Sequence, residues 1–293
     1  MSQNTLNTKM TAIADEIREL SGTTEAMGLD AMATHVGEAN DEVSSQAELL
    51  AQIASALEGK AGGSDTNEAD SLITMTMNSY TNDRVTSIGQ GAFAYATLQS
   101  VNFPAATYIG SSAFRNCSQL TTANFPEVTT LDSYAFYSVG LTTASFPNAT
   151  TIGMYAFGAC PNLTTVNFPA AITIGSSAFI KCGNRFTTVS FPVATTISEF
   201  AFAYCSGLTT ASFPNITTIH SSAFYDCEYL TSLYLTGSSV CTLSSSGAFS
   251  YTPIAGYSVN ARKYGSIYVP ASLLTSYKNA TNWIYFSNRF VGI

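Results

Sequence analysis

The chain has 293 residues, of which 46% are apolar and only 10% are charged, with a net charge of −8. This composition can bury a core, but it excludes a disordered tail and a basic surface for nucleic acid. No apolar run is long enough to cross a membrane, so membrane insertion is not expected, and the N-terminus lacks the basic start and apolar core of a conventional signal peptide.

Charge divides the chain into two parts. Residues 1–70 hold thirteen acidic and three basic side chains and sum to −10, whereas residues 71–293 sum to +2. Between them lies a small, polar, Gly-rich segment, GKAGGSDTNEADS (59–71), whose composition is typical of a flexible linker. We therefore expect a separate N-terminal module, with its linker, at residues 1–64.

The N-terminal module is predicted to form short helices. Each of two segments carries one apolar stripe with heptad spacing. The stripe positions are Leu6, Met10, Ile13, Ile17 and Leu20, followed by Val43, Gln46, Leu50, Ile53 and Leu57. Such short helices must bury the stripe, either in an intramolecular hairpin or by self-association in a homo-oligomer, with a trimer among the candidates. Gln46 on the stripe is typical of a polar residue that sets register.

From residue 85 the sequence repeats. The pair Ala-Phe recurs at steps of 21 to 25 residues, and Phe-Pro recurs between these pairs. The Ala-Phe phenylalanines are Phe93, Phe114, Phe136, Phe157, Phe179, Phe202, Phe224 and Phe249. A fixed period near 22 residues predicts a solenoid of about eight coils, in which each coil buries its phenylalanines only by stacking on its neighbours. We place this solenoid at residues 65–250.

The solenoid ends need caps. Leu72–Met77 alternates as a strand does and is expected to cover the first coil, and residues 251–293 are expected to form a strand-helix cap over the last. Trp283 and Phe286 would cover the open phenylalanine column. With the helical N-terminal module, the whole chain is predicted to be α+β.

Three motifs carry a family resemblance: the LxxLxFP strand, the IGxxAFxxC return and the ending IYVPASLLTSYKNATNW. Over residues 72–293 the chain resembles the BspA-like (Treponema-type) leucine-rich repeat proteins of bacterial surfaces. This resemblance implies a leucine-rich-repeat solenoid and an extracellular adhesion or recognition role. The segment LNTKMTAIADEIRELSG is similar to segments that open tail or fibre proteins of phages and prophages of gut Firmicutes, which implies attachment to other tail proteins through residues 1–64.

The cysteines follow the repeat. Five of the six lie three residues after a repeat phenylalanine, at a position where other coils have Ala96 or Val139. This favours a buried apolar slot over disulfides or a metal site. Cys241 departs from the pattern and is expected to be exposed. Asp226 and Glu228 form an acidic pair that falls short of a calcium cage, and no cofactor or metal is expected.

Two sets of surface residues are candidates for receptor binding. The first is an uncharged strand face represented by Asn102, Asn124 and Asn167, which is either solubilising filler or a face for neutral glycans. The second set consists of aromatic residues beside the Ala-Phe pairs, which either pad the coils or form a binding patch. These residues are Tyr95, Tyr134, Tyr137, Tyr155, Phe200, Tyr204, Tyr225 and Tyr229.

The sequence carries no nucleotide-binding or hydrolase motif, so an enzyme is not expected. We expect a recognition protein that presents the repeat surface to a receptor protein or glycan on a cell surface. The first interpretation is a phage or prophage tail protein in the virion, and the alternative is a bacterial cell-surface or secreted adhesin that binds a host protein or glycan. An extracellular location is expected in the second case.

Overall fold

The computed structural model describes residues 79–81, 85–256 and 263–293. The helices expected within residues 1–64, their linker and the expected N-terminal cap Leu72–Met77 lie outside these residues. Each stripe position from Leu6 to Leu57 therefore stays a prediction, as do the domain boundaries. The described residues form a β-solenoid of about nine turns with one short α-helix.

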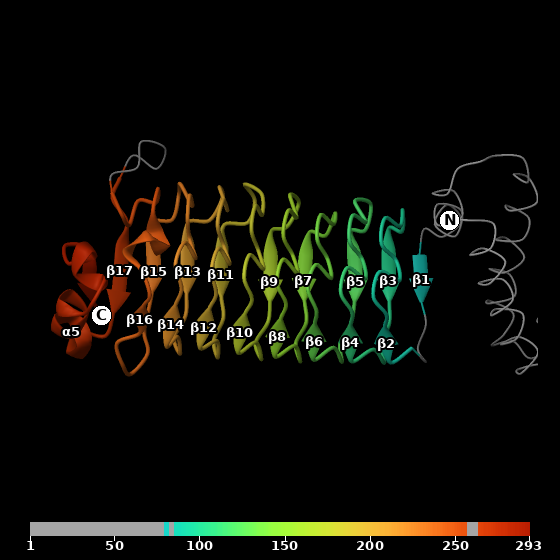
Figure 1. The fold of residues 1–293 in the computed structure, drawn as a ribbon, viewed down its shortest axis with the longest axis horizontal. Coiled ribbons are helices and arrows are strands. Elements are labelled where there is room, and N and C mark those ends of the chain that lie inside the picture. Colours follow the sequence, from blue (N-terminus) through green and yellow to red (C-terminus); the bar gives the residue numbers. More distant parts are fainter. Residues whose placement is uncertain (1–78, 82–84, 257–262) are drawn as a thin grey trace, which may run out of the picture. The chain divides into compact units, whose positions relative to one another are not determined.

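One side of the solenoid is a continuous parallel sheet of eight two-residue strands (Figure 1). Each strand pairs in register with the next, so that Ile88, Ile109 and Leu131 lie side by side in one buried row. The strands are β2 (Ser87–Ile88), β4 (Tyr108–Ile109), β6 (Thr130–Leu131), β8 (Thr151–Ile152), β10 (Thr173–Ile174), β12 (Thr196–Ile197), β14 (Thr218–Ile219) and β16 (Thr242–Leu243).

The other strands also run parallel from coil to coil, but in three separate sheets of three, two and five strands. The first holds β1 (Ser79–Thr81), β3 (Ser100–Asn102) and β5 (Thr122–Asn124), and the second holds β7 (Thr143–Ser145) and β9 (Thr165–Asn167). The third holds β11 (Thr188–Ser190), β13 (Thr210–Ser212), β15 (Ser232–Tyr234), β17 (Ser266–Val269) and β18 (Phe290–Gly292). Strand β17 continues the stack beyond the eight expected coils, which explains the additional turn.

The two interruptions coincide with changes in repeat length. From each Phe-Pro phenylalanine to the next Ala-Phe phenylalanine the spacing is always 11 residues, and this segment contains the strands of the continuous sheet. The link to the following Phe-Pro varies instead. Successive Phe-Pro pairs are 21 residues apart at the β5–β7 interruption, 23 apart at the β9–β11 interruption, and 22 apart where strands are paired. Among the coils that carry a Phe-Pro pair, insertions and deletions therefore fall on one side of the solenoid. In the last coil the spacing from Leu235, which takes the place of the Phe-Pro phenylalanine, to Phe249 is 14 residues, and this longer segment contains β16.

Two columns of phenylalanine fill the interior. The Ala-Phe rings stack nearly parallel, with centroids 5.0–5.5 Å apart from Phe93 to Phe249. The Phe-Pro rings form a second stack, from Phe103 to Phe213, and the two columns meet at tilted or edge-on angles. Burying each ring contributes roughly 1.5–3 kcal/mol, and only neighbouring coils complete that burial.

The segment after each short strand, which we call the return leg, has an unusual backbone. In each of the first seven coils two residues adopt a left-handed conformation: the one before Ala-Phe, such as Tyr134 (φ 60°), and the second after the phenylalanine, such as Ser138 (φ 58°). The N–H groups of Tyr134, Phe136 and Ser138 donate to carbonyls of the next coil. This third ladder between coils offsets the roughly 1–2 kcal/mol that a left-handed non-glycine residue costs.

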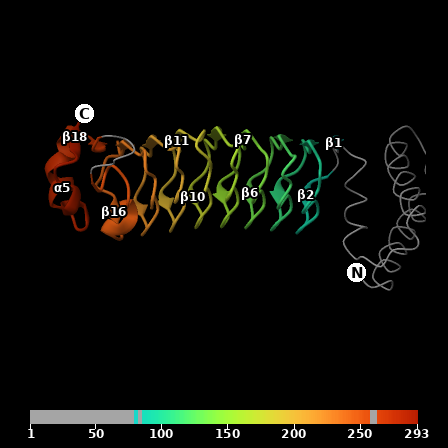
Figure 2. The same cartoon turned by 90° about the horizontal axis from the view of Figure 1, so that it is seen from above.

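The C-terminal residues close the last coil, as expected. Strands β17 and β18 are joined by the 3₁₀ turns η2 (Ala271–Leu273) and η3 (Trp283–Phe286) and the helix α5 (Leu274–Asn279), which lie at the end of the stack (Figure 2). The rings of Trp283 and Phe286 lie 5.9 and 5.5 Å from Phe249, which belongs to the 3₁₀ turn η1 (Ser246–Phe249).

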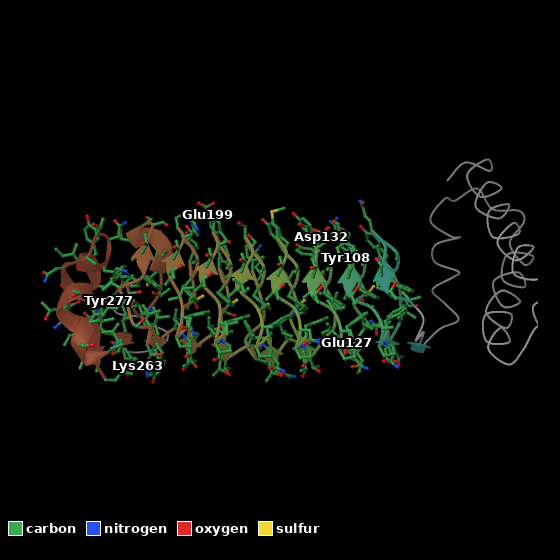
Figure 3. All side chains as sticks on the ribbon, turned by 90° about the horizontal axis from the view of Figure 1, so that it is seen from below. Tyr108, Glu127, Asp132, Glu199, Lys263 and Tyr277 are labelled. Carbon is green, nitrogen blue, oxygen red and sulfur yellow. The ribbon has the colours of Figure 1, made fainter. Side chains whose placement is uncertain are left out.

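The expectation that Cys241 is exposed is wrong. The cap buries this residue to 2% exposure, the Trp283 indole Nε1–H donates to its carbonyl at 2.8 Å, and its own N–H donates to the Tyr277 hydroxyl at 3.2 Å. Figure 3 shows Tyr277 within the cap. Cys241, which lies outside the repeat pattern, is therefore buried under the cap rather than exposed on the surface.

Candidate functional site

The predicted asparagine face is a ladder of side chains bonded to one another. The Asn124 amide donates to the Asn102 side-chain oxygen at 2.7 Å, and the Asn167 amide donates to the Ser145 hydroxyl at 3.2 Å. Asn124 and Asn167 are exposed and Asn102 is half-buried. The amides of Asn124 and Asn167 already have partners in the preceding coil, so a ligand would have to compete with bonds that stabilise the stack.

Threonine hydroxyls extend the backbone ladders in the same way. Those of Thr129 and Thr217 donate to the carbonyls of Thr107 and Thr195 in the preceding coil, at 3.2 and 2.9 Å. On the opposite side, the Thr164 hydroxyl donates to the Thr142 carbonyl at 2.9 Å. Much of the hydroxyl-rich surface therefore holds the coils together, which supports the filler interpretation for the strand faces.

The aromatic candidates gather in two places on the return legs. The first, which we call the tyrosine stack, consists of Tyr134, Tyr137 and Tyr155 with Arg115. Tyr134 and Tyr155 stack face to face at 4.8 Å, and the Arg115 guanidinium lies 5.6 and 5.7 Å from the centroids of Tyr134 and Tyr137. All three rings are half-buried, and Tyr137 meets both Tyr134 and Tyr155 edge-on at 5.6 and 6.2 Å, so the tyrosine stack pads adjacent coils.

The second group, which we call the aromatic ridge, consists of Phe200, Tyr204, Tyr225 and Tyr251. It runs over three successive coils, and its rings meet at tilted or edge-on angles at 5.1–6.5 Å. Tyr251 is 70% exposed, and Tyr204 and Phe200 are also exposed. Because the rings lie oblique to one another, they do not cover each other's faces as Tyr134 and Tyr155 do.

Polar groups flank the aromatic ridge. The Lys181 Nζ lies 5.7 Å from the Tyr204 ring centroid, and Asp226 occupies the equivalent left-handed position between Tyr204 and Tyr251. The pKa of Tyr225 is raised, first by partial desolvation and then by the neighbouring tyrosine hydroxyls. The ridge therefore joins open apolar faces to hydroxyl, ammonium and carboxylate groups.

Sequence reasoning missed Tyr251, Lys181 and Arg115. The sequence did contain a signal for two of them, since Tyr251 and Lys181 occupy the second position after the repeat phenylalanine, as Tyr95 and Tyr204 do.

The structure does not bring every predicted residue together. Tyr95 is 66% exposed on the first complete coil, and Tyr229 is exposed in the link after its return leg.

The six cysteines are free and buried, as predicted for the repeat positions. Cys160 donates its thiol to the Phe136 carbonyl at 3.2 Å, and Cys205 bonds the Phe179 carbonyl in the same manner at 3.0 Å. Burial raises the pKa of Cys117 and of Cys160 to about 12. These thiols are protonated at neutral pH and unsuited to nucleophilic chemistry.

Charged groups are few on the described surface. Tyr108 donates its hydroxyl to Asp132 at 3.0 Å, on the edge of the solenoid along which Glu199 also lies (Figure 3). Among the described residues no group of three or more potential metal ligands comes together, so Asp226 and Glu228 remain a pair. Within the same residues, no helix has the length and apolar character needed to cross a bilayer.

The repeat geometry agrees with a family comparison. Residues 86–193 and 150–264, together more than half of the chain, match the family described as the BspA type leucine-rich repeat region. The chain belongs to the BspA-type leucine-rich repeat family. This confirms the repeat resemblance, whereas nothing in the comparisons supports a phage-tail origin for residues 1–64.

Two solved structures show similarity to this leucine-rich repeat protein. A leucine-rich cell surface protein from Faecalibacterium prausnitzii shares 22% identity at a TM-score of 0.35, covering 72% of this chain and 68% of its own. A leucine-rich repeat protein from Bacteroides ovatus shares 15% identity at a TM-score of 0.28, covering 73% of this chain and 92% of its own. A comparison with curated protein sequences found no match.

Proposed function

We propose that this protein is a non-enzymatic recognition or adhesion protein, which acts outside the cell and presents its leucine-rich repeats to a protein or glycan on another cell surface. The observation that carries the proposal is the aromatic ridge, an exposed set of rings on a rigid scaffold. Membership of the BspA-type family supports the adhesin interpretation. Tyrosine-rich surfaces suit recognition because each ring offers a large contact area and loses little conformational entropy.

Binding of the labelled full-length protein to intact bacterial or host cells tests this proposal. We expect saturable binding that unlabelled protein displaces and that heat-unfolded protein does not show. Absence of saturable binding to every cell type tried would contradict a role in adhesion.

A narrower proposal is a tail-associated receptor-binding protein of a phage or prophage, and it depends on residues 1–64 alone. Light scattering of the full-length chain tests its structural premise. We expect a homo-oligomer, and we expect Ile13→Asp combined with Ile53→Asp to reduce it to a monomer, because both substitutions place a charge on the apolar stripes. A monomeric wild-type chain would contradict the tail-protein interpretation and leave the adhesin proposal standing.

A further inference from the structure

The aromatic ridge has a regular spacing along the solenoid. The Ala-Phe rings of the three coils beneath it lie 5.4 Å apart between Phe202 and Phe224 and 5.5 Å apart between Phe224 and Phe249. Tyr204 and Tyr251 occupy the same position two coils apart, which places them about 10 Å from one another along the axis. A ligand that repeats at this interval would present the same group to both rings.

The backbone beneath the ridge has little hydrogen-bonding capacity left for an extended peptide. The N–H groups of Lys181, Tyr204 and Asp226 donate to carbonyls of the next coil at 2.8–2.9 Å, and those carbonyls belong to Ala203, Tyr225 and Ser250. A peptide that adds as a strand needs unpaired N–H and C=O groups along an edge. A ligand on the ridge would therefore be recognised through side chains.

The charges around the ridge favour a neutral ligand. Glu199 and Asp226 lie next to Phe200 and Tyr225 in the sequence, and Glu228 follows two residues later, whereas Lys181 is the cation that contacts a ridge ring. An anionic polymer would meet this excess of carboxylates and be repelled. A neutral ligand would find ring faces for its apolar surface, and Lys181 and Asp226 as donor and acceptor for its hydroxyls.

We propose that the aromatic ridge binds a neutral, extended, β-linked glycan chain that lies along the solenoid axis. The sugar faces, which carry C–H groups, pack on the outer faces of Tyr204 and Tyr251. One sugar spans about one coil. Because consecutive rings in an extended β-linked chain alternate in orientation, the same sugar face recurs at every second sugar, as the two tyrosines recur at every second coil. This inference rests on the proposed recognition function and identifies the site and the ligand class.

Isothermal titration calorimetry of the full-length protein tests the inference, with cellohexaose and mannohexaose as β-linked probes and maltohexaose as an α-linked probe of equal length. We expect at least one β-linked hexaose to bind more tightly than its disaccharide and more tightly than maltohexaose, by about tenfold or more. No binding of either β-linked hexaose, or stronger binding of maltohexaose, would overturn the proposal.

Ridge variants locate the site. Tyr204→Ala and Tyr251→Ala should each weaken hexaose binding about tenfold or more, whereas Tyr251→Phe, which keeps the ring face, should retain most of it. Tyr95→Ala is the matched control, because Tyr95 holds the same left-handed position on the first complete coil and is also highly exposed. Equal losses in Tyr95→Ala and Tyr251→Ala, with unchanged melting temperatures, would overturn the assignment to the ridge.

Cell binding separates this inference from the proposed function. If ridge variants lose cell binding and removal of glycans from the cells has the same effect, both proposals stand. If wild-type binding survives periodate treatment of the cells but not protease treatment, the receptor is a protein, and the glycan inference fails while the recognition function holds. Tighter binding of polygalacturonate than of either β-linked hexaose would also overturn it, because the proposed ligand is neutral.

Discussion

The interior phenylalanine columns and the aromatic ridge are built on the same coil repeat but differ in what surrounds the rings. Interior rings such as Phe157 are 0% exposed and nearly parallel to their neighbours, whereas Tyr204 and Tyr251 are exposed and oblique to theirs. The repeat fixes the spacing in both places. Burial then decides whether a ring contributes to folding or is available for binding.

The largest effect is expected from a charge placed inside the Ala-Phe phenylalanine column. Phe157→Asp should lower the free energy of unfolding by more than about 5 kcal/mol, because it removes a fully buried ring and leaves a carboxylate without a partner. Calorimetry should show loss or splitting of the melting transition. Tyr95→Asp is the control and should melt within a few degrees of the wild type. A Phe157→Asp variant that melts like the wild type would contradict the stacking of coils.

A second test compares the two surface groups directly. Tyr155→Ala should destabilise the protein by about 1–2 kcal/mol, because it removes a half-buried ring that stacks on Tyr134. Tyr251→Ala should change the stability by less than about 0.5 kcal/mol, because that ring is mostly exposed. Urea denaturation measures both. Equal effects on stability would mean that the tyrosine stack and the aromatic ridge have the same structural role.

The buried cysteines predict that the protein loses stability at alkaline pH. Unfolded thiols lose their protons above about pH 9, whereas the pKa of Cys117, Cys160 and Cys241 in the folded protein is about 12. The unfolded state then binds fewer protons, so stability should fall between pH 9 and 12 and remain unaffected by these groups below pH 9.

At pH 10 each such thiol should lower the stability by about 1.4 kcal/mol. Urea denaturation at a series of pH values measures the decline, and Cys160→Ala should make it shallower. An identical slope in that variant would show that the Cys160 thiol is not responsible.

The smallest expected effect concerns the left-handed positions. Ala159 has φ 55°, so Ala159→Gly should relieve strain and stabilise the protein by up to about 1 kcal/mol. Ala156→Gly, at a buried position of the same return leg whose φ is not positive, should destabilise it instead. Thermal melting of the two variants should show shifts of opposite sign.

The sequence was most informative where a side chain repeats in the interior. The Ala-Phe register, the buried cysteine slot and the covering of Phe249 by Trp283 could all be predicted, because an apolar residue at a fixed period must stack. The burial of Cys241 could not be predicted, because it depends on the cap formed by residues 266–293. Nor could the sequence separate Tyr155 from Phe200, since both stand directly before an Ala-Phe pair and differ in ring packing and exposure.

The polar candidates show a second limit. From the sequence, Asn102 and Asn124 are candidates for binding a ligand, yet their side-chain amides form a hydrogen bond with each other across coils. Only the distance between neighbouring coils reveals such pairing. The interruptions between β5 and β7 and between β9 and β11 also escaped prediction, although the link lengths that accompany them are visible in the sequence.

The left-handed residues of the return legs have a consequence for how such a surface can diversify. Their backbone conformation is held by bonds to the adjacent coil, and the positions accept Gly, Ser, Asn, Ala, Lys, Asp, Tyr and Phe in different coils. A point mutation there can exchange one recognition group for another with little effect on the chain path. Copying or deleting a whole coil would instead change the length of the solenoid in steps of one coil. The chemistry of the surface and the length of the solenoid can therefore vary independently.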